Sequence, residues 1–163
     1  MSEFVNLSRE ERALYNPAFT AVLTARTVQG HRTQFGQPCP VALAVLGAVM
    51  ALQPAVRDRL PRNTNAGVSR WVEENRTVKV AMTQNATALA AVVRPGLLFA
   101  LQTTLLSCTD QGLLNLPTGR LKKVITGPTE EVVAIQKAAH MLGRWLPSTG
   151  SMSTVMTLLG VRP

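Results

Sequence analysis

Apolar residues recur at helical spacing along most of the chain. The clearest stripe lies after Pro128 and consists of Val132, Ile135, Ala139, Leu142 and Leu146. Steps of three and four residues place these side chains on one face of an α-helix. The preceding Thr129 can cap the helix start, and two glutamates in the first turn suit the positive end of the helix dipole. This pattern predicts an amphipathic helix that ends at residues 147–150, where the sequence reads PSTG.

Two helices are predicted near the start of the chain. Ser8 and Glu11 have the spacing of a capping box, in which each side chain accepts a hydrogen bond from the other residue's backbone N–H. Asn16 ends this first helix because it precedes a proline, and it can cap a second helix that begins at Pro17. The second helix is predicted to run to Gly30, and a loop follows over residues 31–38. One face of this second helix carries Phe19, Val22, Leu23 and the stem of Arg26.

The middle of the chain is predicted to form four helices, and prolines lie in two of the three connections between them. Residues 40–52 read PVALAVLGAVMAL and contain no polar side chain, which indicates a buried helix. The stretch is too short for a membrane core of about 30 Å, since a helix rises only about 1.5 Å per residue. Pro54 and Pro61 then bracket a short basic turn. Further helices are predicted over residues 64–75, 78–93 and 97–107, with a break at Pro95-Gly96 between the last two.

A small β-hairpin is predicted at residues 112–124, which read GLLNLPTGRLKKV. The turn falls at Pro117-Thr118-Gly119, and the second strand carries Arg120, Lys122 and Lys123. Side chains alternate along a strand, so Arg120 and Lys122 would share one face. These three residues are candidates for contact with DNA or a protein partner. A charged strand edge that blocks edge-to-edge pairing is the alternative.

The order of elements predicts a mainly α fold. The sequence is interpreted as a single domain over residues 1–163, a compact helical domain with one small β-hairpin wing. A helical N-terminal part (8–61) packs on a winged-helix-like part (63–127), and C-terminal helices follow over residues 129–159. In DNA-binding winged helices, one helix enters the major groove and the wing contacts the backbone. Here residues 97–107, LLFALQTTLLS, offer no Arg or Lys to a groove, which favours contact with protein.

Composition and charge restrict the partners. The chain of 163 residues is 46% hydrophobic and only 16% charged, so its apolar excess must be covered by its own core or by a lasting subunit interface. The net charge of +8 favours polyanions on encounter. Outside the hairpin, the one local concentration of cations is Arg57, Arg59 and Arg62, which we include among the candidate DNA or partner contacts.

No motif for catalysis, cofactor binding or metal binding is found. Cys39 and Cys108 lie far apart without zinc-type spacing and are predicted to be buried thiols, and His31 and His140 belong to no recognisable site. We therefore expect a protein that is not an enzyme and that needs no cofactor or metal. The polar start MSEFVNLSREER predicts no signal peptide, and no apolar run reaches the length of a membrane span, so we expect a cytoplasmic protein without membrane contact.

Several stretches together resemble a known family. They are LYNPAFTAVLTARTVQGH (Leu14–His31), the apolar block at 40–52, LPRNTNAGVSRWVEEN (Leu60–Asn75), GLLNLPTGRLKK, and the ending KAAHMLGRWLPSTGSMSTVMTLLGVRP. The combination of NPAF near the start with LGRW and LLGVRP at the end is similar to the small middle components of bacterial three-component ABC-ATPase systems, which are related in organisation to Lamassu-type antiphage defence.

The resemblance implies a non-enzymatic adaptor in a defence complex directed at phage or plasmid. It would link a coiled-coil ABC ATPase of the SMC or Rad50 type to an effector subunit such as a nuclease, with DNA backbone contact at the basic edge of the hairpin. Candidate protein contacts are Asn16, Pro17, Phe19, Trp71 and Trp145. The first three are equally well explained by a simple helix break with core packing. A stand-alone winged-helix DNA-binding regulator is the alternative function, and a small helical enzyme subunit is a third.

Overall fold

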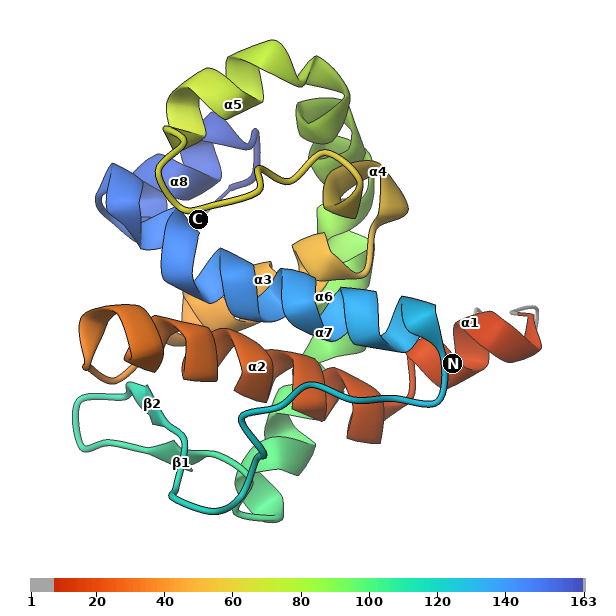
Figure 1. Cartoon of the computed structure of the whole chain (residues 1–163), viewed down its shortest axis with the longest axis vertical. Helices are drawn as coiled ribbons and strands as arrows, with labels where there is room; N and C mark the ends of the chain where they lie inside the picture. Colours follow the sequence, from red (N-terminus) through yellow and green to blue (C-terminus); the bar gives the residue numbers. More distant parts are fainter. Residues whose placement is uncertain (1–7, 163) are drawn as a thin grey trace.

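The computed structural model describes residues 8–162, and over this range the protein is mainly helical with one small antiparallel hairpin (Figure 1). The predicted fold class is thereby confirmed. The prediction about the polar start of the chain falls largely outside the described residues. The elements are α1 (Arg9–Leu14), α2 (Pro17–Phe35), α3 (Val41–Ala51), α4 (Pro54–Arg57), α5 (Val68–Glu74), α6 (Arg76–Gln102), β1 (Ser107–Cys108), β2 (Leu114–Asn115), α7 (Glu130–Trp145), the 3₁₀ helix η2 (Leu146–Thr149) and α8 (Met152–Leu158).

Helix α2 is the central element of the fold. It contacts α3, α6 and α7, and it is buried without interruption from Leu23 to His31. Each of the three neighbours approaches it at a glycine. A Cβ atom at Gly47 or Gly96 would collide with a threonine side chain of α2, and one at Gly143 would collide with the Thr27 carbonyl. Backbones therefore approach α2 more closely than any larger residue would allow.

Buried apolar side chains from all parts of the described chain meet in one cluster. Leu43 of α3, Met82 of α6 and Leu142 of α7 are each fully buried in it. At roughly 25 cal/mol per Å² of apolar surface, each such side chain contributes about 1.5–3 kcal/mol to folding. Of the predicted α7 stripe, Val132 is half-buried and the other four residues are buried, as the sequence pattern indicated.

Helix starts follow the caps that the sequence predicts. The Glu11 side chain accepts from the Ser8 backbone N–H at 2.8 Å, and the Ser8 hydroxyl accepts from the Glu11 N–H at 3.1 Å. Asn16 Oδ1 accepts from the Ala18 N–H at 2.8 Å, with Pro17 in the first turn of α2. Thr129 Oγ1 accepts from the Val132 N–H at 3.1 Å. These predictions are confirmed because a cap depends only on residues two or three positions away.

Two predicted helix boundaries are wrong. Helix α2 continues past Gly30 to Phe35, because Gly30 packs against the His140 carbonyl of α7 and the turn at Gly36 has a left-handed φ of 65°. Helix α5 begins at Val68 rather than near residue 64. The side chain of Asn63 accepts from the Asn65 N–H at 2.9 Å, and this local turn replaces the expected helix cap.

The predicted break at Pro95-Gly96 is also wrong, because α6 is one helix of 27 residues that contains Pro95. Its buried positions run from Val78 to Ala100 at steps of about three and four residues, and Gly96 is one of them. Packing of Gly96 against Thr20 and Ala21 holds the helix together where proline removes one backbone bond. The predicted order of three helices before a wing is therefore not confirmed, since α5 and α6 are the two helices present there.

The hairpin lies earlier in the chain than predicted. Ser107 pairs with Asn115 and Cys108 with Leu114, and Leu114 also forms an antiparallel bridge with Cys39. The turn is TDQG at 109–112, in which the Gly112 N–H donates to the Thr109 carbonyl at 2.9 Å. Residues 117–124 are irregular, so the expected alternation of Arg120 and Lys122 on one strand face does not apply. Within residues 8–162, no helix has the length and apolar character of a membrane span.

Candidate functional site

The residues between the hairpin and α7 form the most distinctive surface of the molecule. We call residues 116–128 the basic segment, because it carries Arg120, Lys122 and Lys123, all three exposed. The segment has no regular secondary structure, and Figure 1 shows it running along α2 to the start of α7. A charged loop of this kind needs side-chain anchors to hold one conformation.

The middle of the basic segment is anchored by Arg26 of α2. Its Nη1 donates to the Lys122 carbonyl and to Gln29 Oε1 at 3.0 Å, and its Nε donates to Gln136 Oε1 of α7 at 3.0 Å. The Nη1 to Lys122 oxygen distance is 2.6 Å. Arg26 is only 4% exposed, so water competes little for these bonds. Hydrogen bonds to a charged donor contribute about 1.5–3 kcal/mol each.

Further bonds hold both ends of the segment. Gln136 Nε2 donates to the Thr126 carbonyl at 3.1 Å, close to the start of α7. Arg32 Nη1, one helical turn beyond Gln29, donates to the Leu116 carbonyl at 2.9 Å. Gln29 Nε2 also donates to the Lys122 carbonyl, at 3.4 Å. Four helical side chains therefore fix the backbone at 116, 122 and 126, and the exposed cations lie on a backbone that is held in place.

The charged groups of the basic segment are positive. All the oxygen atoms that Arg26 contacts are neutral, and burial lowers the pKa of its guanidinium. Beside it lies a groove of about 570 Å³ between α2, α7 and the basic segment, and its charged or titratable lining residues are Arg32, Lys123 and His140. The lining includes no Asp or Glu. This surface suits an anionic group of a partner, such as a carboxylate or a phosphate.

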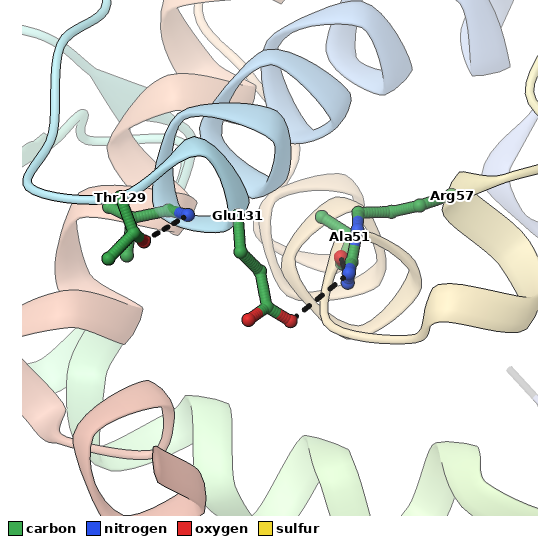
Figure 2. A network of polar contacts seen from close by, with 5 residues as sticks. Ala51, Arg57, Thr129 and Glu131 are labelled. Atoms are coloured by element: carbon green, nitrogen blue, oxygen red, sulfur yellow. Dashed lines mark hydrogen bonds and ion pairs between the residues drawn. The ribbon is translucent and has the colours of Figure 1, made fainter.

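The second predicted cationic cluster is not a uniform surface. The Arg57 side chain forms hydrogen bonds within the protein. Its Nη1 donates to the carbonyl of Ala51, the last residue of α3, over a distance of 2.8 Å. Its Nη2 lies 3.5 Å from Glu131 Oε1 in the first turn of α7 (Figure 2). The Arg57 side chain is 11% exposed. Arg59 and Arg62 are exposed, so only these two could reach a partner without rearrangement.

The two tryptophans lie together in the core. Trp71 and Trp145 meet edge to face, with ring centroids 5.0 Å apart and planes at 82°. Their indole N–H groups donate to the Arg59 and Ala66 carbonyls, each at 2.6 Å. Trp71 is 5% exposed and Trp145 is fully buried. In this conformation neither ring is available to a partner, in contrast to the expectation from the sequence.

The NPAF stretch divides into structural and exposed positions. Asn16 and Pro17 start α2 and are exposed, while Phe19 is half-buried against the core cluster. The structure thus accounts for Asn16 and Pro17 through the helix start. Part of the Phe19 ring is left accessible.

Titratable and metal-ligating residues are not gathered into a catalytic arrangement. His31, predicted in a loop, lies in α2, and its Nδ1 is 3.1 Å from the Gln37 carbonyl. Burial raises the pKa of the Cys39 thiol to about 12, whereas Cys108 is exposed, contrary to the prediction of two buried thiols. Across residues 8–162 no three His, Cys, Asp or Glu side chains are close enough to hold a metal ion.

Sequence reasoning missed the Arg26, Gln29 and Gln136 cluster. It assigned only the apolar stem of Arg26 to the core face of α2, although the whole side chain is buried. The available signal was that a polar residue continued an otherwise apolar stripe. Such a residue must find polar partners inside the fold, because a buried donor without one costs about 1–3 kcal/mol.

A family model described as ABC-three component (ABC-3C) system Middle Component 3 matches residues 5–163. No curated protein and no solved structure matches the chain.

Proposed function

Because the chain belongs to the ABC-three component (ABC-3C) system Middle Component 3 family, we propose that it is the adaptor subunit between the ATPase and the effector of such a system. The family match carries this proposal, since it extends from residue 5 to residue 163 and so includes every element of the fold. More specifically, we propose that the ATPase is a coiled-coil protein of the SMC or Rad50 type and that the effector is a nuclease. The complex would act in the cytoplasm in defence against phage or plasmid, and this subunit would catalyse no reaction.

The geometry of the basic segment supports an adaptor role. An adaptor must present fixed surfaces to two partners, and association costs less free energy when the surface is ordered in advance. The bonds from Arg26, Arg32 and Gln136 order the basic segment before any partner arrives. We propose that its exposed cations, Arg120, Lys122 and Lys123, contact DNA phosphates or an acidic partner surface within the complex.

Co-expression of the complete operon with a tag on this subunit tests the adaptor role. We expect the ATPase and the effector to co-purify, and deletion of this subunit to separate them and abolish the activity of the system. The pure subunit should neither hydrolyse ATP nor cut DNA. Either activity, if lost on a point substitution in this chain, would contradict the proposal. So would a lone subunit that protects one specific DNA duplex, which is the behaviour of a regulator.

DNA contact is tested separately in the assembled complex. Arg120→Ala combined with Lys122→Ala should weaken DNA binding about equally for all sequences and lower the salt slope by roughly two, near 0.9 for each lost phosphate contact. The control Arg70→Ala with Arg76→Ala removes the same charge from exposed positions on α5 and α6 and should leave the slope unchanged. Equal slopes for both double variants would assign the basic segment to protein contact.

A further inference from the structure

A second surface, on α3 and α6, is apolar and incompletely covered. A groove of about 400 Å³ lies between these helices, and α8 and the residues that follow it complete its lining. Val41, Val45 and Val49 of α3 recur every four residues along one side. Ala86, Ala90 and Arg94 of α6 do the same along the other. Residues four apart lie on the same helix face, so two ridges flank the groove.

The α3 side of this groove explains part of the apolar excess in the sequence. Helix α3 has no polar side chain in any direction. The fold encloses it on all sides from Leu46 to Ala51, but covers its first five residues on one side only. Val41 remains 37% exposed, Ala42 is exposed and Val45 is half-buried. Met156 of α8, also half-buried in the lining, is a flexible side chain that adapts to different neighbours. A helix used only for the core of this chain would carry polar residues on the exposed side.

The charges at the groove have one sign. Arg94 and Arg162 are its two charged lining residues, both are exposed, and no Asp or Glu lines it. Neither groove arginine forms an ion pair with a carboxylate whose side chain the structure describes. Charges of this sign at an apolar groove attract acidic side chains and fix the orientation in which they bind.

We propose that this groove is the docking site for an acidic amphipathic α-helix of another component of the ABC-3C system. The aliphatic stripe of that helix would fill the space between α3 and α6, and its Asp or Glu side chains would pair with Arg94 and Arg162. Helices with apolar residues at i, i+3, i+4 and i+7 bind grooves of this shape. The inference rests on the proposed adaptor function and assigns it a surface distinct from the basic segment.

The test uses the complex assembled from the complete operon and two matched variants. Ala42→Glu introduces bulk and negative charge at an exposed groove position in the first turn of α3, where a carboxylate does not oppose the helix dipole. Ala88→Glu makes the same change at an exposed position of α6 outside the groove lining. We expect Ala42→Glu to reduce co-purification of one component at least about tenfold, and Ala88→Glu to leave it unchanged. A photo-crosslinking residue at position 42 should react with an acidic helical segment of that component, and one at position 88 should not.

The outcomes separate this inference from the adaptor proposal. If the wild-type subunit purifies without the other components, both are overturned. If the wild-type complex assembles and Ala42→Glu assembles equally well, the groove is not the docking site and the adaptor role remains. A crosslink from position 42 to a second copy of this chain, or to a segment without acidic residues, also overturns the groove proposal.

Discussion

At the scale of single residues, Arg26 has the largest role in shaping the candidate site. It is a buried cation whose recorded partners are two glutamine side chains and one backbone carbonyl. Burying a charge without an opposite charge is costly, and here the cost is offset by several good hydrogen bonds. The result is a loop held by a helix, in place of the self-supporting hairpin that the sequence suggested.

Arg26→Met should destabilise the protein by about 2–4 kcal/mol, because the side-chain oxygens of Gln29 and Gln136 lose their donor and the Lys122 carbonyl keeps only the longer bond from Gln29 Nε2 at 3.4 Å. Trypsin should also cleave the basic segment faster. The control Arg70→Met removes an exposed cation paired with Glu74 and should leave the stability almost unchanged, because solvent screens that ion pair. Urea denaturation measures the first effect and limited proteolysis the second. Equal stability and equal cleavage rates in the two variants would show that Arg26 does not anchor the segment.

At the scale of elements, α6 shows how tertiary packing overrides a local signal. Proline removes one helical hydrogen bond, and glycine lowers helix propensity by about 1 kcal/mol relative to alanine. Locally, both residues oppose a helix. Gly96 nevertheless lies where α6 crosses α2, and no larger side chain fits there. The close crossing stabilises a continuous helix that carries the proline on its exposed side.

Neighbouring substitutions in α6 should therefore have opposite effects. Pro95→Ala restores the backbone donor at an exposed position and should stabilise the protein by about 1–3 kcal/mol. Gly96→Ala should destabilise it by about 1–3 kcal/mol, because the new methyl group collides with Thr20 and with the backbone of Ala21. Melting temperatures of the two variants provide the measurement. Helix propensity acting alone would stabilise both, so a rise in both temperatures would contradict the packing account.

Contacts between elements also explain why Arg57 is a structural residue. Its guanidinium satisfies a carbonyl at the end of α3 and approaches the first turn of α7, so it connects α3 and α4 with a helix that is distant in sequence. The Glu131 side chain is 53% exposed and the contact is 3.5 Å, so that ion pair adds little. The bond to Ala51 is the stronger reason for the position of Arg57.

At the scale of the whole molecule, positive charge is distributed between the surface and the interior. The net charge of +8, which counts the histidines as neutral, gives an attractive field for anions, while the charged Arg26 is buried. The titratable His31 is buried and His140 is half-buried. Burial lowers the pKa of both histidines, and for His140 the positive charges of Arg144 and Arg26 lower the pKa further. The folded protein thus resists protonation at both positions more than the unfolded chain does.

This difference predicts that stability falls as the pH decreases. An unfolded histidine has a pKa of about 6.5, so below that pH the unfolded chain binds protons that the folded protein does not. The stability contribution is fully present above about pH 6.5 and is lost as the pH falls toward the lowered folded pKa values. Each histidine can change the free energy of unfolding by at most about 1.4 kcal/mol per pH unit.

The measurement is urea denaturation at several pH values between about 7.5 and 5. His31→Gln combined with His140→Gln should give a flatter dependence of unfolding free energy on pH than the wild type. The comparison is of slopes, so any loss of packing in the variant does not affect it. Identical slopes would mean that neither histidine resists protonation in the folded state.

Features that depend on neighbours along the chain could be predicted from the amino-acid sequence. The caps at Ser8, Asn16 and Thr129 and the apolar stripe of α7 were predictable, because they depend on residues within a few positions or on the helical period. The buried character of most of α3 followed from its composition, and the mainly helical class followed from the same local patterns. Thr129 and the α7 stripe place the end of the basic segment, so part of the candidate site was also accessible from sequence.

Contacts between residues that are distant in sequence could not be predicted in this way and followed from the three-dimensional fold. Leu114 pairs with Cys108 and Cys39, and no local rule selects those partners over the basic residues after Gly119. Arg26 reaches Lys122 across 96 positions of sequence, and Trp145 donates to Ala66 across 79. Such contacts form because burial of apolar surface brings the helices together and every polar group enclosed by that packing must then find a partner. For the same reason the structure, and not the sequence, showed that the first residues of α3 are left partly uncovered in the groove that Arg94 also lines.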